Sequence, residues 1–423
     1  MQLWLIPTVY VCASLIAGVV IPRIEQAYLA SYTLGMSVAS AQAYLSAAAS
    51  GMLALTGIVF AMAFVVVQFS AIAYSPRLVL WFARDRVLFH SLGAFAATFV
   101  YALCTLAWVD RHGSGRVPLF SALMVGLLLV FSMLLFARLV QRLSDLQITS
   151  VLQLIGDKGR VVIHDMFARV DQGQGGQWRF GVEPADRIAL GPVSQTLGYS
   201  ESPRTIASLD VDALVRLAQE REAVIVMASA VGDTLVDGSV LLRVHRAKGS
   251  LPERALMRAI HLDTERTFEQ DPKYPIRLLV DIAIKALSPA INDPTTAVQA
   301  IDQIEDLLRR LVRCDLDAGF ARDSNGVVRL IVPIPTWDDY LALAFDEIRQ
   351  FGATSVQVMR RLRAALIGLA ESTTVAARAE AVQRCLKHLD LVIERSPLDS
   401  EDRATASQED RQGLGLSRRR IEA

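Results

Sequence analysis

The residues best suited to chemistry gather in one run, YPIRLLVDIAIKALSPAINDPTTAVQAID, between positions 274 and 302. Arg277, Asp281 and Lys285 are spaced four apart in its apolar first half, so on a helix they line one face and can pair in sequence. Charges on an otherwise buried helix are costly unless they are paired. The spacing therefore predicts an internal ladder of ion pairs.

The second half of this run predicts a corner between two helices. Ser288 and Pro289 end the first helix, and Asn292 or Asp293 can cap the next one. Hydroxyl groups follow at the positive end of that second helix, where an anion can bind. Two interpretations stay open, a rigid structural corner and a site for a small anionic ligand. The ligand or regulatory candidates are the charged, amide and hydroxyl side chains of the run: Arg277, Asp281, Lys285, Ser288, Asn292, Asp293, Thr295 and Thr296.

Other catalytic signatures are absent from the sequence. It contains no nucleophile elbow, phosphate-binding loop, metal-binding helix or paired-carboxylate motif. Cys12, Cys104, Cys314 and Cys385 are far apart and lack the Cys/His spacing of a zinc site. No basic stripe with interleaved aromatic residues indicates nucleic-acid binding. We therefore expect no metal, no cofactor and no nucleic-acid partner, and an enzyme is the less favoured class.

The elements that carry these residues begin with a strongly apolar first third. No charged residue occurs from Gln26 to Pro76, although the whole chain has 43 basic and 43 acidic residues. Apolar runs of about 18 residues or more are typical of membrane spans, because each residue of a helix adds about 1.5 Å toward the thickness of the bilayer. Four such runs predict transmembrane helices at about residues 3–21, 43–73, 87–109 and 118–140.

The rest of the chain predicts a domain of mixed helix and strand. A β-rich subdomain is expected over residues 146–250, with strands at 160–164, 177–182, 187–193, 204–209, 223–228 and 240–245. The glycine turns around residues 231–238 favour a small β-barrel-like unit there. A helical subdomain over 251–395, with one buried strand at 326–335, and a disordered tail over 396–423 complete the chain. The predicted fold class is an α-helical integral membrane domain of four transmembrane helices followed by an α+β cytoplasmic domain.

The arginines of the short loops predict the orientation. Membrane-interface residues are expected in the link after the second span: Arg77, Trp81, Arg84 and Arg86. Together with Arg138 and Arg142 they put five arginines on one side of the bilayer, against Arg23, Arg111 and Arg116 on the other. Basic residues concentrate on the cytoplasmic side. We therefore expect a multi-pass protein of a bacterial inner membrane, with the second domain in the cytoplasm.

The second span is rich in small residues, which let helices approach closely. Its weakly polar side chains are the pore-lining candidates: Ser50, Thr56 and Gln68. They favour a homo-oligomeric channel or transport-like pore with a cytoplasmic regulatory domain. The alternative is a membrane-anchored sensor or scaffold with a ligand-binding cytoplasmic domain. The expected partners are the lipid bilayer, further copies of the chain and a small anionic ligand.

Two segments carry a resemblance to a known family. FSAIAYSPRLVLWFARDR leaves the second span, and LLVDIAIKALSPAINDPTTAVQAID contains the ladder and the corner. In both, the chain resembles a family of predicted bacterial membrane proteins known as a domain of unknown function, over about residues 1 to 390. The resemblance implies the membrane topology and brings no activity, substrate or catalytic residue.

The orientation can be tested with reporter fusions. Reporters fused after Leu80 and after Ser200 should both read cytoplasmic, and one fused after Gly113 should read external, because the arginine excess places those loops on opposite sides of the bilayer. A cytoplasmic signal at Gly113 would contradict the four-span topology.

Overall fold

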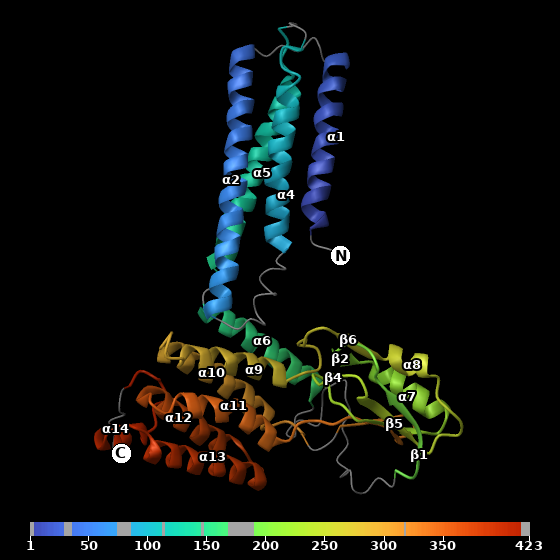
Figure 1. The fold of residues 1–423 in the computed structure, drawn as a ribbon, viewed down its shortest axis with the longest axis vertical. Coiled ribbons are helices and arrows are strands. Elements are labelled where there is room, and N and C mark those ends of the chain that lie inside the picture. Colours follow the sequence, from blue (N-terminus) through green and yellow to red (C-terminus); the bar gives the residue numbers. More distant parts are fainter. Residues whose placement is uncertain are drawn as a thin grey trace. The chain divides into compact units, whose positions relative to one another are not determined.

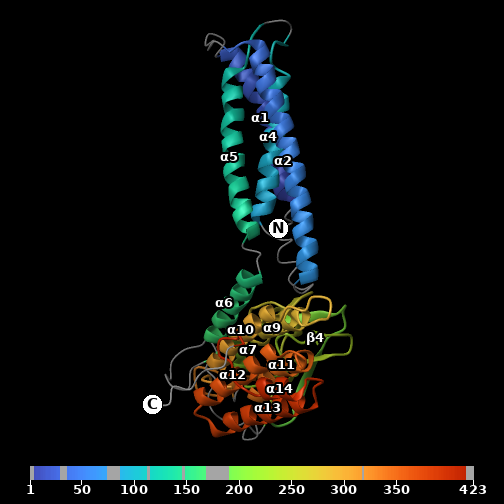
Figure 2. The same ribbon diagram turned by 90° about the vertical axis from the view of Figure 1, so that its left-hand side faces the viewer.

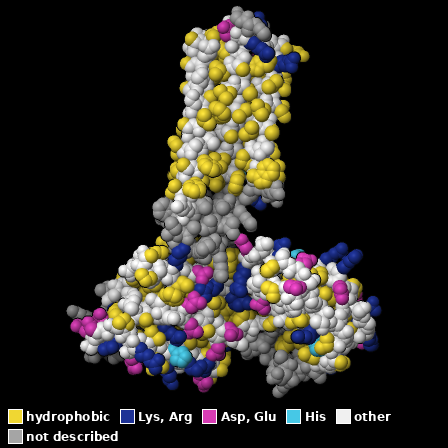
Figure 3. Space-filling model, viewed as in Figure 1, with side chains coloured by type: hydrophobic (Ala, Val, Ile, Leu, Met, Phe, Trp, Pro, Cys, Tyr) yellow, Lys and Arg dark blue, Asp and Glu magenta, His cyan; other side chains and the backbone are white. Residues whose placement is uncertain are grey.

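The computed structural model describes residues 4–28, 36–73, 86–111, 115–144, 148–167, 190–316 and 319–415. The chain divides into two compact units, Met1–Gln147 and Ile148–Ala423, which we call the membrane unit and the α+β unit (Figure 1). Hydrophobic side chains cover most of the visible face of the membrane unit, whereas Lys, Arg, Asp and Glu are spread over the α+β unit (Figure 3).

The membrane unit contains four long helices, as the sequence predicts. They are α1 (Leu5–Tyr28), α2 (Val38–Ala73), α4 (Arg86–Leu106) and α5 (Leu119–Ser144). Each is long and apolar enough to cross a bilayer. The prediction of four N-terminal apolar helices is thereby confirmed, although α1 continues beyond the expected end of the first span, to Tyr28.

Helix α4 is the hub of the membrane unit, because α1, α2 and α5 all pack against it. Small residues allow the close approach. A Cβ atom on Gly18 of α1 would lie 2.5 Å from the Cβ of Cys104. Several polar groups inside the unit are paired, as the hydroxyls of Thr98 and Ser132 show at 3.0 Å, whereas the buried hydroxyls of Ser91 and Tyr101 have no hydrogen-bond partner among the described residues. Such pairing matters because hydrocarbon offers a polar group no other partner.

One buried carboxylate ties α1 to the start of α5. Glu25 accepts hydrogen bonds from the backbone nitrogens of Phe120 and Ser121 at 2.6 and 3.0 Å, and from the Ser121 hydroxyl at 2.8 Å. The first turn of a helix has free N–H groups and a positive dipole end, so a carboxylate stabilises it. The only acidic residue of the described spans thus has a structural explanation.

The strands of the α+β unit form two open sheets. The larger sheet has the order β1-β5-β3-β8-β7, and the smaller has the order β4-β2-β6. Only the β3–β8 pair is parallel among the described pairs. The strands are β1 (Val193–Gly198), β2 (Arg204–Leu209), β3 (Val224–Met227), β4 (Thr234–Leu235), β5 (Val240–His245), β6 (Ile260–Asp263), β7 (Phe320–Arg322) and β8 (Val328–Ile331). No closed barrel appears among the described residues, so the barrel-like unit is unconfirmed.

The sheets recruit strands from beyond residue 250, where helices were expected to dominate and one strand was predicted, at 326–335; β8 lies within that predicted strand. β6 pairs with β2, and β8 pairs with β3. Two short helices, α7 (Val211–Glu220) and α8 (Glu253–Arg258), accompany the sheets. The β-rich and helical parts are therefore interleaved along the chain, because pairing partners lie far apart in the sequence.

The strand predicted at 160–164 is wrong, since these residues belong to helix α6 (Ile148–Met166). Val162 and Ile163 continue a buried face begun by Val151, Leu152 and Ile155, which has helical spacing. β-branched neighbours alone favoured a strand. The strand predicted at 177–182 lies outside the described residues, as do residues 187–189 of the one predicted at 187–193, in which only Val193 belongs to a strand, β1.

The helical layer is built around α10 (Pro294–Leu311), which packs against α6, α9 (Lys273–Ala286) and α12 (Val356–Ser372) (Figure 2). Ile301, Ile304, Leu307 and Leu308 of α10 are completely buried. The remaining helices are α11 (Trp337–Phe351), α13 (Ala376–Arg395) and α14 (Ser400–Ala406).

The tail predicted to be disordered from residue 396 is ordered as far as residue 415. After α14, the buried carboxylate of Asp410 accepts the backbone N–H groups of Gly413 and Gly415, at 3.0 and 2.6 Å. Arg360 of α12 donates to the Gly415 carbonyl at 2.8 Å. The polar composition predicted disorder, because the partner on α12 is not visible in the local sequence. Residues 416–423 lie outside the described residues.

Both ends of α10 are capped by side chains. Asp293 accepts the backbone N–H of Thr296 at the N-terminus, at 3.1 Å. At the other end, the buried guanidinium of Arg378 donates to the carbonyls of Val312 and Cys314, at 2.7 and 2.8 Å. A cation is favoured there, because the final carbonyls of a helix lack partners and carry the negative dipole end.

Because Arg378 of α13 caps α10, we expect substitutions of two arginines in α13 to have different effects on the free energy of unfolding. Arg378→Ala should lower the free energy of unfolding by about 1–3 kcal/mol, because it leaves buried carbonyls unsatisfied. Arg384 is the matched control, since its side chain is 57% exposed and pairs with exposed Asp338. Arg384→Ala should change stability by about 0–1 kcal/mol. Equal effects in chemical denaturation would contradict the capping role.

Candidate functional site

The predicted ladder is a branched ion pair that joins two helices. Arg277 of α9 donates through Nε to Asp281 at 2.6 Å, and through both terminal nitrogens to Glu347 of α11, at 2.8 and 2.7 Å. The pKa of Glu347 is lowered by its hydrogen bonds to Arg277, and the pKa of Arg277 is raised, with those bonds as the main cause. Lys285 is half-buried one turn beyond Asp281. Only the Glu347 branch was not predicted.

The predicted corner between α9 and α10 satisfies its own polar groups. The Ser288 hydroxyl donates to the Lys285 carbonyl at 2.7 Å, and Asn292 adopts a positive φ of 48°. The Asp293 carboxylate accepts both the backbone N–H and the hydroxyl of Thr296, at 3.1 and 2.5 Å. Thr295 is exposed. An anion arriving at this helix end would meet the charge of Asp293.

Two of the pore-lining candidates lie on one side of α2, and the third lies on another. Ser50 and Gln68 are 18 residues apart, which is about five helical turns, and both are exposed. Thr56 is half-buried and donates to the Met52 carbonyl within its own helix, at 2.7 Å. Among the membrane-interface candidates, Arg77, Trp81 and Arg84 lie outside the described residues. Arg86 is exposed at the first residue of α4.

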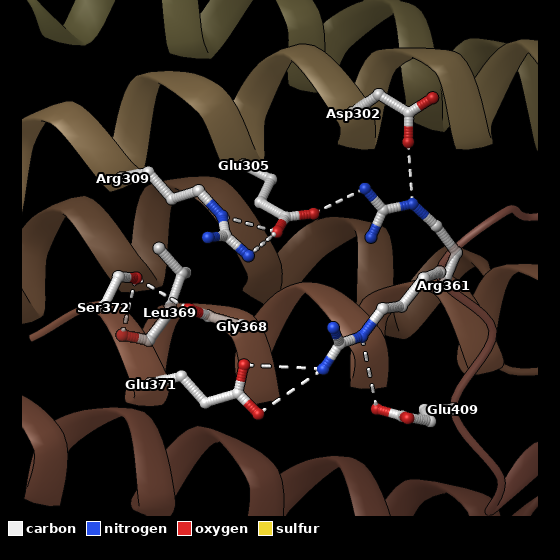
Figure 4. A network of polar contacts seen from close by, with 10 residues as sticks. Asp302, Glu305, Arg309, Arg361, Gly368, Leu369, Glu371, Ser372 and Glu409 are labelled. Atoms are coloured by element: carbon white, nitrogen blue, oxygen red, sulfur yellow. Dashed lines mark hydrogen bonds and ion pairs between the residues drawn. The ribbon is translucent and has the colours of Figure 1, made fainter. Parts of the chain in front are cut away.

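A further charge network, not predicted from the sequence, lies between α10 and α12 (Figure 4). Arg361 of α12 is almost fully buried and contacts Asp302 and Glu305 of α10, at 2.7 and 2.5 Å. Arg309 pairs with the same Glu305 at 2.7 Å. Gly368 of α12 makes room for this network, because a Cβ atom there would collide with the Arg309 guanidinium.

Sequence reasoning missed a cavity of about 280 Å³ between α6 and the C-terminal end of α10, which we call the arginine pocket. Its polar walls are Arg160 and His164 of α6, with Asp306, Arg309, Arg310 and Arg313 from α10 and the turn after it. Ile163, Phe167 and Cys314 supply an apolar lining. Arg309, Arg310 and Arg313 are visible in the sequence as a basic helix end, but their neighbours on α6 lie about 150 residues away.

A second, much smaller cavity of about 20 Å³ contains two buried polar groups. Asp271 is 1% exposed, and Tyr340 is fully buried. Within the described part of the chain, neither the Asp271 Oδ2 atom nor the Tyr340 hydroxyl has a hydrogen-bond partner. Burial raises the pKa of Asp271, and burial together with the charge of Asp271 raises that of Tyr340. The volume is that of about one water molecule.

Comparison with known proteins places the chain in a family. The model of the family described as "Predicted membrane protein (DUF2254)" matches residues 1–367. The chain belongs to this family. It is 28% identical to "Uncharacterized protein Rv1290c" of Mycobacterium tuberculosis and to "Uncharacterized protein Mb1321c" of Mycobacterium bovis, over 95% of this chain and 78% of each relative. No solved structure matches the chain.

The matched region contains every feature described above except the ordered tail and the helix that caps α10. Residues 1–367 include the four spans, the Arg277 ion pair and all lining residues of the arginine pocket. Arg378 and Asp410 lie beyond it. The resemblance noted in the sequence is therefore confirmed, and it identifies the chain as a predicted membrane protein.

Asp271 predicts an unusual dependence of stability on pH. The pKa of Asp271 is raised in the folded protein. Its contribution to the free energy of unfolding is therefore complete below the unfolded pKa of about 3.9 and is lost as the pH rises through the folded pKa. Asp271→Asn should therefore gain stability relative to the parent protein as the pH rises. The measurement is the melting temperature of both proteins between about pH 4 and pH 8.

Asp323 is the control with the opposite sign. Arg329 pairs with the Asp323 carboxylate at 2.8 Å and lowers its pKa. The contribution of Asp323 to the free energy of unfolding is therefore present at neutral pH and is lost as the pH falls through the folded pKa. Asp323→Asn should therefore lose stability relative to the parent as the pH rises to about 4, and the difference should stay constant between about pH 4 and pH 8. A difference between Asp271→Asn and the parent that stays constant with pH would refute the raised pKa.

Proposed function

We propose that the protein acts as a homo-oligomer in the membrane, with the α2 helices of neighbouring copies facing one another around a shared pore. The observation that carries this proposal is the exposed face of α2. Small residues recur there at alternating steps of four and three and all are exposed in the single chain: Ala43, Ala47, Ser50, Ala54, Gly57 and Ala61.

Membrane helices have a physical reason to associate through such a face. Lipid tails are as apolar as a leucine side chain, so the hydrophobic effect does not drive helices together in a membrane. Small residues favour association instead, because they allow close packing of the backbones and polar contacts between helices. A Cβ atom added to Gly51 or Gly57 would have no atom of the described chain within 4 Å. The stripe is thus open to a neighbouring copy.

A route through a single copy has less support. The cavity described within the membrane unit, beside Val59, Leu88 and Phe136, has a volume of about 10 Å³ and an apolar lining. Such a space holds no chain of waters. A conducting path would therefore run between copies, where Ser50 offers a hydroxyl.

The arginine distribution supports a location in a bacterial inner membrane with the α+β unit in the cytoplasm. The described arginines of this set are consistent with it, since Arg86 begins α4 and Arg138 lies in the last part of α5. The membrane unit then presents the N-terminus and the exit of α5 to the same side.

The second candidate function is a membrane-anchored sensor, and the arginine pocket favours it. A sensor requires a ligand site and a connection to the membrane. One wall of the pocket is α6, which follows α5 in the chain after residues 145–147. A pore and a sensor are compatible if the ligand controls conduction.

The oligomer is tested by cysteine cross-linking along α2. In a chain whose four native cysteines are replaced by alanine, Ala47→Cys, Ala54→Cys and Ala61→Cys should each form disulfide-linked dimers under oxidation. Leu53→Cys and Phe60→Cys are matched controls, because both native side chains are exposed but lie about 100° around the helix from the stripe. They should remain monomeric.

The same variants separate a pore from a dry interface. Water-soluble thiol reagents should label stripe positions deep in the span if the α2 helices line a pore. Labelling confined to the ends of α2, combined with efficient cross-linking, would support an oligomer without conduction. Equal cross-linking of stripe and control positions would overturn the proposed interface.

A further inference from the structure

The walls of the arginine pocket bring basic side chains from two helices to one cavity. Arg160 and His164 are one turn apart on α6, and Arg309, Arg310 and Arg313 occupy the last turn of α10 and the turn after it. A helix C-terminus favours cations, so part of this charge has a structural cause. That cause does not explain why α6 adds a guanidinium and an imidazole opposite them.

The carboxylates near the pocket do not neutralise all of its cations. Arg160 pairs with Asp157 and Asp306, at 2.7 and 2.8 Å, and Arg310 shares Asp306 at 3.2 Å. Within the described part of the chain, the Arg313 side chain has no hydrogen-bond or ion-pair partner, and it is exposed. The pocket therefore offers one unpaired guanidinium, that of Arg313, and two that share Asp306, of which Arg160 also pairs with Asp157.

The lining also contains an apolar surface. Ile163 and Phe167 are 2% exposed and Cys314 is 3% exposed, and all three border the cavity. An inorganic anion would use only the arginines. An organic group attached to the anion would also contact these side chains, which stabilises binding by removing the apolar surface of the ligand itself from water.

We propose that the arginine pocket binds a small organic phosphate monoester. Guanidinium groups match phosphate oxygens through paired, charge-assisted hydrogen bonds. A phosphate dianion would contact Arg313 and compete with Asp306 for Arg160 and Arg310, while its organic group packs against Ile163 and Phe167. The volume of about 280 Å³ suits a ligand at the small end of the range for organic molecules.

Binding in this position joins α6 to α10 more strongly. In the structure, Asp306 of α10 already holds Arg160 of α6 at 2.8 Å, and Gln303 contacts the same guanidinium at 3.3 Å. A ligand adds a second bridge beside these contacts. This inference deepens the sensor candidate and is independent of the α2 interface, so failure of one leaves the other unaffected.

The test is calorimetric titration of the purified full-length protein in detergent with phenyl phosphate, at low ionic strength. Phenyl phosphate should bind more tightly than inorganic phosphate and than phenol, because only it uses both the arginines and the apolar lining. Arg313→Gln should weaken binding by about tenfold or more, since it removes charge-assisted hydrogen bonds without stranding a carboxylate. Arg384→Gln, an exposed arginine on α13, is the matched control and should bind like the parent.

A second variant changes the affinity in the opposite direction. Asp306→Asn frees Arg310, leaves Arg160 with Asp157 alone and removes a repelling charge, so it should bind phenyl phosphate several-fold more tightly, which damage to the fold would not produce. Equal affinities of Arg313→Gln and Arg384→Gln, or phenyl phosphate binding no better than phenol, would overturn the proposal.

The same phosphate monoester group occurs in free metabolites and in the headgroup of phosphatidic acid. Repeating the titration in lipid nanodiscs with and without phosphatidic acid distinguishes these sources. Loss of phenyl phosphate binding only with phosphatidic acid would identify the lipid headgroup as an occupant. Unchanged binding in both would identify a soluble ligand, and either result upholds the site.

Discussion

The burial of one central helix is the interaction on which each unit depends. In the membrane unit α4 is covered by α1, α2 and α5, and in the α+β unit α10 is covered by α6, α9 and α12. Burying a large aliphatic side chain contributes about 1.5–3 kcal/mol, so the completely buried leucines and isoleucines of α10 dominate its packing. The features with functional potential lie where this covering stops, on the outer face of α2 and at the C-terminal end of α10.

The balance of charges around α10 differs between its covered flank and its C-terminal end. The flank of α10 that faces α12 has Asp302 and Glu305; buried Arg361 pairs with both, and Arg309 supplies a second positive charge at Glu305. Such a pair holds the helices in register, although replacing it by apolar residues need not weaken the fold. At the C-terminal end the balance changes, because arginines outnumber the carboxylates that reach them. That local excess, rather than the net charge of zero, gives the arginine pocket its preference for anions.

Features set by neighbours in the sequence could be predicted, and features set by distant partners could not. The spans and the Arg277–Asp281 pair follow from spacing along one helix, as does the cap of α10 by Asp293. Glu347 joined the ladder from 70 residues away, and Asp410 ordered a tail whose composition suggests disorder. The arginine pocket needed α6 to be a helix, whereas its β-branched residues had suggested a strand. A single sequence does not show which apolar face meets which partner.

The most direct measurement of the central claim is a cryo-electron microscopy structure of the full-length protein in lipid nanodiscs. The account predicts a symmetric particle in which the stripe of α2 from Ala43 to Ala61 faces neighbouring copies, with water along the shared axis if the protein conducts. A monomer, or an oligomer whose contacts use α1 or α5 while the α2 stripe faces lipid, would contradict it.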